Sequence, residues 1–195
     1  MKTILLIACI AICFATSFAQ APSPAPMAKT PSMVASPQGP GSTKDPVATS
    51  LRVLLQRSQN NTVGAIEAMP ADKFSYKPTP EQISFAHLVV HITESNYSMC
   101  SRVADIAAPK VEQVKDTDSK DQLLAAARGS FDFCATSLAN VDDTKLGDNL
   151  DYGFAKGPRA MAAIFLASGW ADHYGAAAMY LRLNGILPPT AQPKK

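Results

Sequence analysis

The stretch GPRAMAAIFLASGWADHYGAAAMYLRLNGILPP, residues 157–189, decides the fold of this 195-residue chain. Pro158 suits the first position of a helix, where a missing backbone N–H costs nothing. Asn184-Gly185 can take the left-handed conformation that ends helices, and Pro188-Pro189 forbids continuation. About 26 residues lie between these signals, which gives about 39 Å of helix at about 1.5 Å per residue. A helix of this length is typical of one rod of a bundle.

One face of this predicted helix is apolar except for a single histidine. At helical spacing the face contains Ala162, Phe165, Gly169, His173, Ala176 and Tyr180. We expect the other helices to pack around this face. Any chemistry is therefore expected near His173.

Two more helices are predicted earlier in the chain. Asp45-Pro46 supplies an N-cap and a first-turn proline, and apolar residues then recur at helical spacing over about 46–68. Thr79-Pro80 repeats the same start signal, which predicts a second helix over about 80–106.

A third helix is predicted over about 119–140, because Ser119-x-x-Gln122 forms a capping box. Residues 141–157 are polar and contain glycine, which predicts a loop. With the last helix, the chain has four helical segments and no run with the alternation of a strand. The sequence therefore predicts an all-α fold, a four-helix bundle.

The beginning of the chain has the pattern of a secretory signal peptide. Residues 1–19 contain a lysine near the start, an apolar core and small residues before the expected cleavage site. The apolar run is shorter than the about 20 residues that span a bilayer, so no membrane span is expected after signal removal. Residues 20–42 are rich in Pro, Ala and Ser, which predicts a disordered linker. We expect an exported protein, periplasmic or secreted, with its bundle in residues 43–190 and a tail in residues 191–195.

Export changes the interpretation of the cysteines. Removal of the signal peptide leaves only Cys100 and Cys134. In an oxidising compartment two cysteines favour a single disulfide, which here would join two helices. Two buried free thiols are the alternative.

The net charge is only +2, and the sequence has no basic cluster with interleaved aromatic residues. Nucleic acid is therefore not an expected partner. The expected ligand is a small molecule of unknown identity. A bundle of this size could also form a homodimer through a helix face, although the sequence singles out no face.

The second predicted helix carries a polar stripe over residues 84–98, beside a separate apolar stripe. The polar stripe either faces solvent or lines a cavity opposite His173. Within it, His87-x-x-x-His91 and His91-x-x-Glu94 place metal-binding groups on one face. Imidazole and carboxylate ligands suit Zn²⁺, Ni²⁺ or Fe²⁺.

Two motifs resemble those of the DinB-like family, most closely its exported bacterial members. They are HLVVHITESNYSMCSRV, residues 87–103, and WADHYGAAAMYLRLNGILPP, residues 170–189. The resemblance covers about residues 46–190 and implies a four-helix bundle, commonly up-down-down-up. It also implies a metal held inside by three histidines, and an activity as a metal-dependent hydrolase or a thiol-dependent transferase.

Laid on this sequence, the family's ligand positions fall on His91, His173 and Gly169. Glycine cannot bind a metal, so the third ligand would have to come from His87 or Glu94, either of which would otherwise serve as a general base. Two functions therefore stay open. One is an enzyme with a partly degenerate metal site, and the other is a binding or structural bundle that has lost the site.

Two further residues of the last helix are assigned to its structure. Trp170, next to the position of the missing ligand, is expected to be a packing or rim residue. Arg159, near the start of the helix, is expected at the surface.

Overall fold

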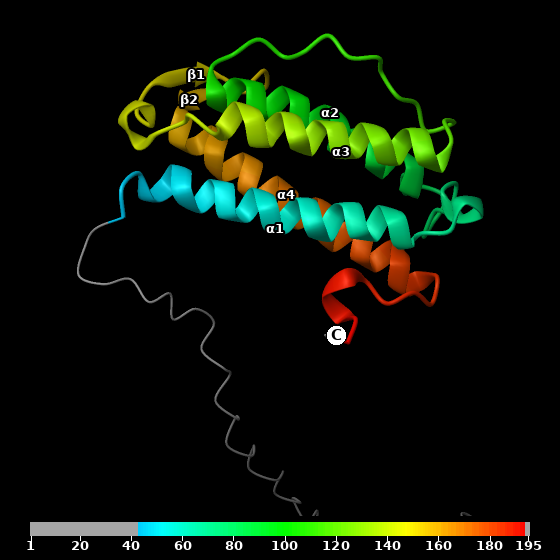
Figure 1. The fold of residues 1–195 in the computed structure, drawn as a ribbon. Coiled ribbons are helices and arrows are strands. Elements are labelled where there is room, and N and C mark those ends of the chain that lie inside the picture. Colours follow the sequence, from blue (N-terminus) through cyan, green and yellow to red (C-terminus); the bar gives the residue numbers. More distant parts are fainter. Residues whose placement is uncertain (1–42, 194–195) are drawn as a thin grey trace, which may run out of the picture. The chain divides into compact units, whose positions relative to one another are not determined.

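A computed structural model of the chain describes residues 43–193. The predicted signal peptide and linker, residues 1–42, lie outside the described residues. The described part contains four α-helices: α1 Pro46–Ala68, α2 Phe85–Ala104, α3 Lys120–Leu138 and α4 Arg159–Leu183 (Figure 1). It also contains three 3₁₀ turns, η1 Ala71–Lys73, η2 Asp143–Lys145 and η3 Pro189–Ala191, and two short strands, β1 Asn149–Asp151 and β2 Lys156–Pro158. None of the described helices combines the length and hydropathy that a membrane span requires.

The four helices form a bundle in which α1 and α2 each pack against both α3 and α4. The connection between α2 and α3, residues 105–119, returns along the bundle, so these two helices run parallel to each other (Figure 1). α1 and α4 run in the opposite direction. The up-down-down-up order implied by the family resemblance is therefore confirmed.

α1 begins at Pro46 as predicted, but its cap comes from elsewhere in the chain. The backbone N–H groups of Val47 and Ala48 donate to the two carboxylate oxygens of Asp143, at 2.9 and 2.8 Å. The prediction that Asp45 is the capping side chain is wrong. Asp143 lies 95 residues beyond Ala48, so the α3–α4 connection holds the first turn of α1 in place.

α2 begins at Phe85, later than the predicted start at residue 80. The Oγ of Ser84 accepts a hydrogen bond from the backbone N–H of His87 at 3.1 Å, which is the bond of an N-cap. The N–H of Phe85 donates to the carbonyl of Tyr76 at 3.1 Å. Because the η1 connection satisfies this first-turn group, the helix starts where that connection meets it.

The C-terminal ends of α1 and α3 are each capped by a basic side chain from the other helix. Arg52 of α1 donates to the carbonyls of Leu138 and Val141, at 3.1 and 2.9 Å, at the end of α3. Lys120 of α3 donates to the carbonyls of Glu67 and Met69, at 2.7 and 2.8 Å, at the end of α1. Carbonyl groups that helix ends leave without partners are thus satisfied across the helix pair.

The predicted loop over residues 141–157 is wrong in part, because it contains η2 and an antiparallel hairpin. β1 pairs with β2 in the register Asn149↔Pro158, Leu150↔Gly157 and Asp151↔Lys156. The Tyr152 hydroxyl donates to the carbonyl of Pro158 at 2.6 Å. A Cβ at Gly157 would lie 2.7 Å from that hydroxyl oxygen, so any larger residue there would displace the Tyr152 side chain from this hydrogen bond. Strands of three residues are too short to show alternation in the sequence.

Arg159 is buried, with only 4% of its surface exposed, so the expectation of a surface residue is wrong. Its Nη1 donates to the carbonyl of Val103 at 2.6 Å, and its Nε donates to the carbonyl of Lys145 at 3.2 Å. Its Nη2 lies 3.5 Å from the carboxylate of Asp105. These contacts join the end of α2, the η2 turn and the start of α4.

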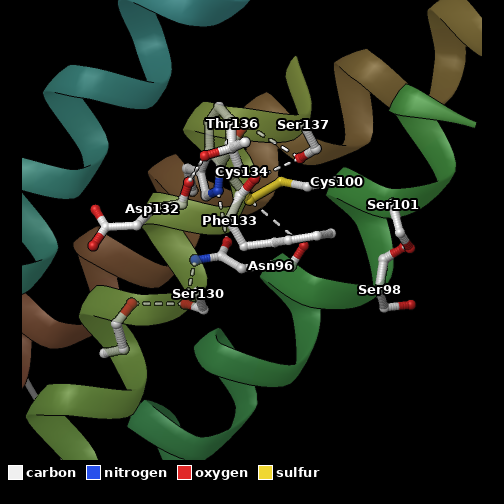
Figure 2. Close-up of a disulfide and its surroundings, with 12 residues drawn as sticks. Asn96, Ser98, Cys100, Ser101, Ser130, Asp132, Phe133, Cys134, Thr136 and Ser137 are labelled. Carbon is white, nitrogen blue, oxygen red and sulfur yellow. Dashed lines mark hydrogen bonds between the residues drawn. A yellow bond between two sulfur atoms is a disulfide. The ribbon is translucent and has the colours of Figure 1, made fainter. Parts of the chain in front are cut away.

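Cys100 and Cys134 form a disulfide that joins α2 to α3 inside the core, as Figure 2 shows. Both residues are fully buried, and their Cα atoms lie 5.2 Å apart. The predicted pairing is confirmed. The crosslink connects the two parallel helices, which no tight turn could connect.

Removal of the disulfide should lower the free energy of unfolding. The bond spans 34 residues, and a crosslink of that span contributes about 3–4 kcal/mol by constraining the unfolded chain. We expect the Cys100→Ala/Cys134→Ala double variant to lose this amount in urea denaturation followed by circular dichroism. Wild-type protein kept reduced should lose a similar amount. A double variant that unfolds at the same urea concentration as the oxidised wild type would contradict the prediction.

Candidate functional site

A buried chain of hydrogen bonds joins α2, α3 and α4 next to the candidate site. The Nε1 of Trp170 in α4 donates to Oδ1 of Asn96 in α2 at 2.8 Å. The Nδ2 of Asn96 donates to Oγ of Ser130 in α3 at 3.0 Å, and that hydroxyl donates to the carbonyl of Ala127 at 2.7 Å (Figure 2). Indole and amide bonds are directional, so this chain fixes the rotation of α4 about its own axis.

A cavity of about 220 Å³ lies between α2 and α4, beside Trp170. Its lining consists of Ser95, Asn96, Met99, Phe154, Phe165, Leu166, Gly169, Trp170 and His173. His173 is the only titratable side chain among these described residues, and most of the others are apolar. The cavity therefore suits a small, mostly apolar group with one polar contact.

Gly169 is the position at which the family resemblance places the third metal ligand. A Cβ built on Gly169 would meet its nearest heavy atom, Cε1 of His173, at 3.9 Å, which is an ordinary van der Waals distance. Packing therefore does not require glycine here. Glycine in the interior of a helix is about 1 kcal/mol less favourable than alanine. The missing side chain leaves the space that the cavity contains.

His173 is partly buried, and its ring packs edge-on against that of His91. The ring centroids lie 4.9 Å apart, and the planes make an angle of 84°. The Nδ1 of His173 is buried and has no hydrogen-bond partner in the described part of the chain. The pKa of His173 is lowered to about 4, chiefly by burial and to a smaller extent by the neighbouring charge of His91, while the charge of Asp172 opposes the shift. The imidazole is therefore neutral at pH 7 and offers an acceptor nitrogen.

The β1–β2 hairpin supplies the outer wall of the cavity. The ring of Phe154, which is 69% exposed, lies 5.6 Å from that of Phe165 and 6.0 Å from that of Tyr152. Phe165 was predicted on the inward face of the last helix, but it is 39% exposed at this rim. Phe154 was not predicted from the sequence, because a single aromatic residue in an apparent loop carries no periodic signal.

Of the four predicted metal-binding residues, the structure brings only His91 and His173 together. His87 is exposed, and its Nδ1 lies 3.7 Å from the carboxylate of Asp116. Glu94 is exposed and lines a different cavity, under the α2–α3 connection. Among residues 43–193 no three His, Cys, Asp or Glu side chains gather where they could hold an ion. The donors do not fit a three-ligand metal site, and metal binding stays a prediction.

Comparisons with known proteins agree with this architecture. The family model described as DinB superfamily matches residues 54–176. A solved DinB-like protein of Bacillus subtilis is similar, with a TM-score of 0.60 and 21% identity over 74% of this chain and 99% of that one. A DinB-like protein of Bacillus cereus has a TM-score of 0.58 and 16% identity over 70% of this chain and 93% of that one. The comparison with curated proteins gives no match.

The low pKa of His173 predicts a specific loss of stability in acid. In the unfolded chain this histidine takes up a proton near pH 6.5, whereas in the folded protein it stays neutral until about pH 4. Between these values the unfolded state binds more protons, so stability falls as the pH is lowered through this window. The His173→Gln variant should lose less stability between pH 7 and pH 4.5 than the wild type, by about 1–2 kcal/mol after solvent screening.

Urea denaturation at the two pH values measures this difference. His87→Gln, a change at an exposed histidine, is the matched control and should follow the wild type. Equal losses in all three proteins would contradict the assignment.

Proposed function

Because the chain belongs to the DinB superfamily, we propose that it uses the helical bundle of that family to bind a small, mostly apolar molecule beside Gly169. The observation that carries this proposal is the cavity of about 220 Å³ at the position of the missing ligand. The ligand takes the place of a protein side chain between α2 and α4. Binding, rather than metal-dependent catalysis, is the proposed activity.

The walls of the cavity determine the class of ligand. Trp170 is 2% exposed and is held in place by Asn96, so its ring is a fixed apolar surface. Phe165 and Phe154, whose ring centroids lie 5.6 Å apart, also line the cavity. A lining of such rings favours a planar apolar group, because aromatic side chains contribute large contact areas with little loss of entropy.

The polar end of the ligand is assigned to His173. Its imidazole is neutral at pH 7, so it accepts a hydrogen bond without attracting an anion. The proposed ligand therefore carries a hydroxyl or N–H group that donates to this ring.

A second candidate is a metal-dependent hydrolase or transferase, and the contact between His91 and His173 is the observation that favours it. His91 and His173 would be the ligands, with His87 or Glu94 as third ligand or general base. A metal would supply Lewis-acid chemistry there. Because two histidines are a weak site, we expect wild-type protein to retain little Zn²⁺ or Ni²⁺ in elemental analysis. Gly169→His should bind more tightly, whereas stoichiometric metal in the wild type, lost in His91→Ala, would favour this candidate.

We further propose that the protein is exported, to the periplasm or the medium. The pattern of residues 1–19 and the disulfide support this proposal, because disulfides persist in oxidising compartments. Sequencing of the N-terminus of protein recovered outside the cytoplasm should begin at Gln20. An unprocessed chain starting at Met1 would contradict the proposed export.

The binding proposal can be tested with phenol, because the only tryptophan in the sequence lines the cavity. Phenol should change the fluorescence of Trp170 on excitation near the red edge of tryptophan absorption. Gly169→Leu should fill the cavity and abolish the change. Toluene, which lacks the hydroxyl, should bind about fivefold more weakly than phenol, the cost of one hydrogen bond.

Two variants control this experiment. Ser168→Leu adds the same side chain at a neighbouring exposed position and should bind phenol like the wild type. Gly169→Ala should raise the free energy of unfolding by about 0.5–1 kcal/mol, because it removes a helical glycine without a clash. A wild-type protein that does not respond to phenol, or a Gly169→Leu variant that still does, would refute the proposal.

A further inference from the structure

The C-terminal half of α4 turns one face away from the bundle. The exposed residues of that face recur every three or four positions: Asp172, Gly175, Met179, Arg182 and Leu183. Met179 is 55% exposed and Leu183 is 52% exposed. We call these five residues the outer face of α4. The helix packs against α1 and α2 through its other sides.

Gly175 lies in the middle of the outer face, and packing within the bundle does not account for it. In the described part of the chain, apart from its two neighbours and the backbone of its own helix, no atom lies within 4 Å of a Cβ built on Gly175. Gly64 differs, because a Cβ there would lie 3.1 Å from Pro189. Glycine weakens a helix interior relative to alanine, so a glycine without a local reason is a cost to the isolated bundle. Its absent side chain would allow another helix to approach closely.

The two charges of the outer face are complementary to each other under two-fold symmetry. Asp172 and Arg182 lie at equal distances along the helix from Ala177, and Gly175 and Met179 lie at equal distances from the same point. If two α4 helices cross antiparallel through their outer faces at the level of Ala177, whose own side chain is buried inside the bundle, each Asp172 faces an Arg182 and each Met179 faces a Gly175. The long methionine side chain then fills the space that glycine leaves.

We propose that the outer face of α4 binds a second copy of this chain, as a two-fold homodimer whose axis passes between Gly175 and Met179. A two-fold interface must be complementary to itself, and this face has that property in both charge and size. A surface that binds lipid would instead place several basic residues beside its apolar ones, whereas this face has one acidic and one basic residue. The inference is independent of the proposed ligand in the cavity.

Sedimentation of the oxidised mature protein over a range of concentrations tests the proposal. We expect a dimer whose mass is twice that of the monomer. Met179→Glu should raise the dissociation constant at least about tenfold, because it places an unpaired charge at the centre of the contact. Met161→Glu, at another exposed methionine of α4 outside the five residues, is the matched control and should dimerise like the wild type.

A charge-swap experiment tests whether the dimer forms through the outer face of α4 or through another surface. Asp172→Arg and Arg182→Asp should each weaken the dimer, and the double variant should restore it. A wild type that stays monomeric, equal behaviour of the two methionine variants, or a double variant that is not restored would each overturn the proposal. Sedimentation of a monomeric wild type with vesicles of anionic phospholipid would overturn it in favour of a lipid surface.

Discussion

The side-chain amide of Asn96 is the interaction on which the arrangement of three helices depends. It accepts from the Trp170 indole in α4 and donates to the Ser130 hydroxyl in α3, in a fully buried setting. Both amide groups are satisfied, so the network has little freedom to rotate. Because Trp170 is fixed in this way, Gly169, the residue before it, and His173, about one turn after it, line the space beside α2. The cavity is a result of that rotation.

The same rotation explains why two histidines meet while a metal set does not form. His91 and His173 lie across the α2–α4 contact, whereas His87 and Glu94 lie on other parts of α2. The side chain that would complete the set is absent at Gly169. The two helices approach each other at His91 and His173, and the position at which the family resemblance places a third donor, Gly169, contributes space.

The sequence predicted most of the fold, because the helices carry strong local signals. The start of α3 followed from its Ser119–Gln122 capping box, and the end of α4 from Gly185, whose φ of 73° favours glycine. The cap of α1 and the burial of Arg159 depend on residues distant in sequence, so no local pattern could show them, whereas the start of α2 has a local N-cap, Ser84, which the prediction passed over. The site was predicted only in part, since the His91–His173 contact follows from two helix faces but the rim formed by Phe154 depends on the hairpin.

The parallel course of α2 and α3 has a consequence for how quickly the chain reaches its native state. Neighbouring helices joined by a short turn can pair almost as soon as they form, but these two must wait for residues 105–119 to return along the bundle. α1 and α4, also neighbours, lie at opposite ends of the folded sequence. Such distant pairings raise the contact order, and folding slows as contact order rises. We therefore expect this bundle to fold more slowly than an up-down-up-down bundle of equal length.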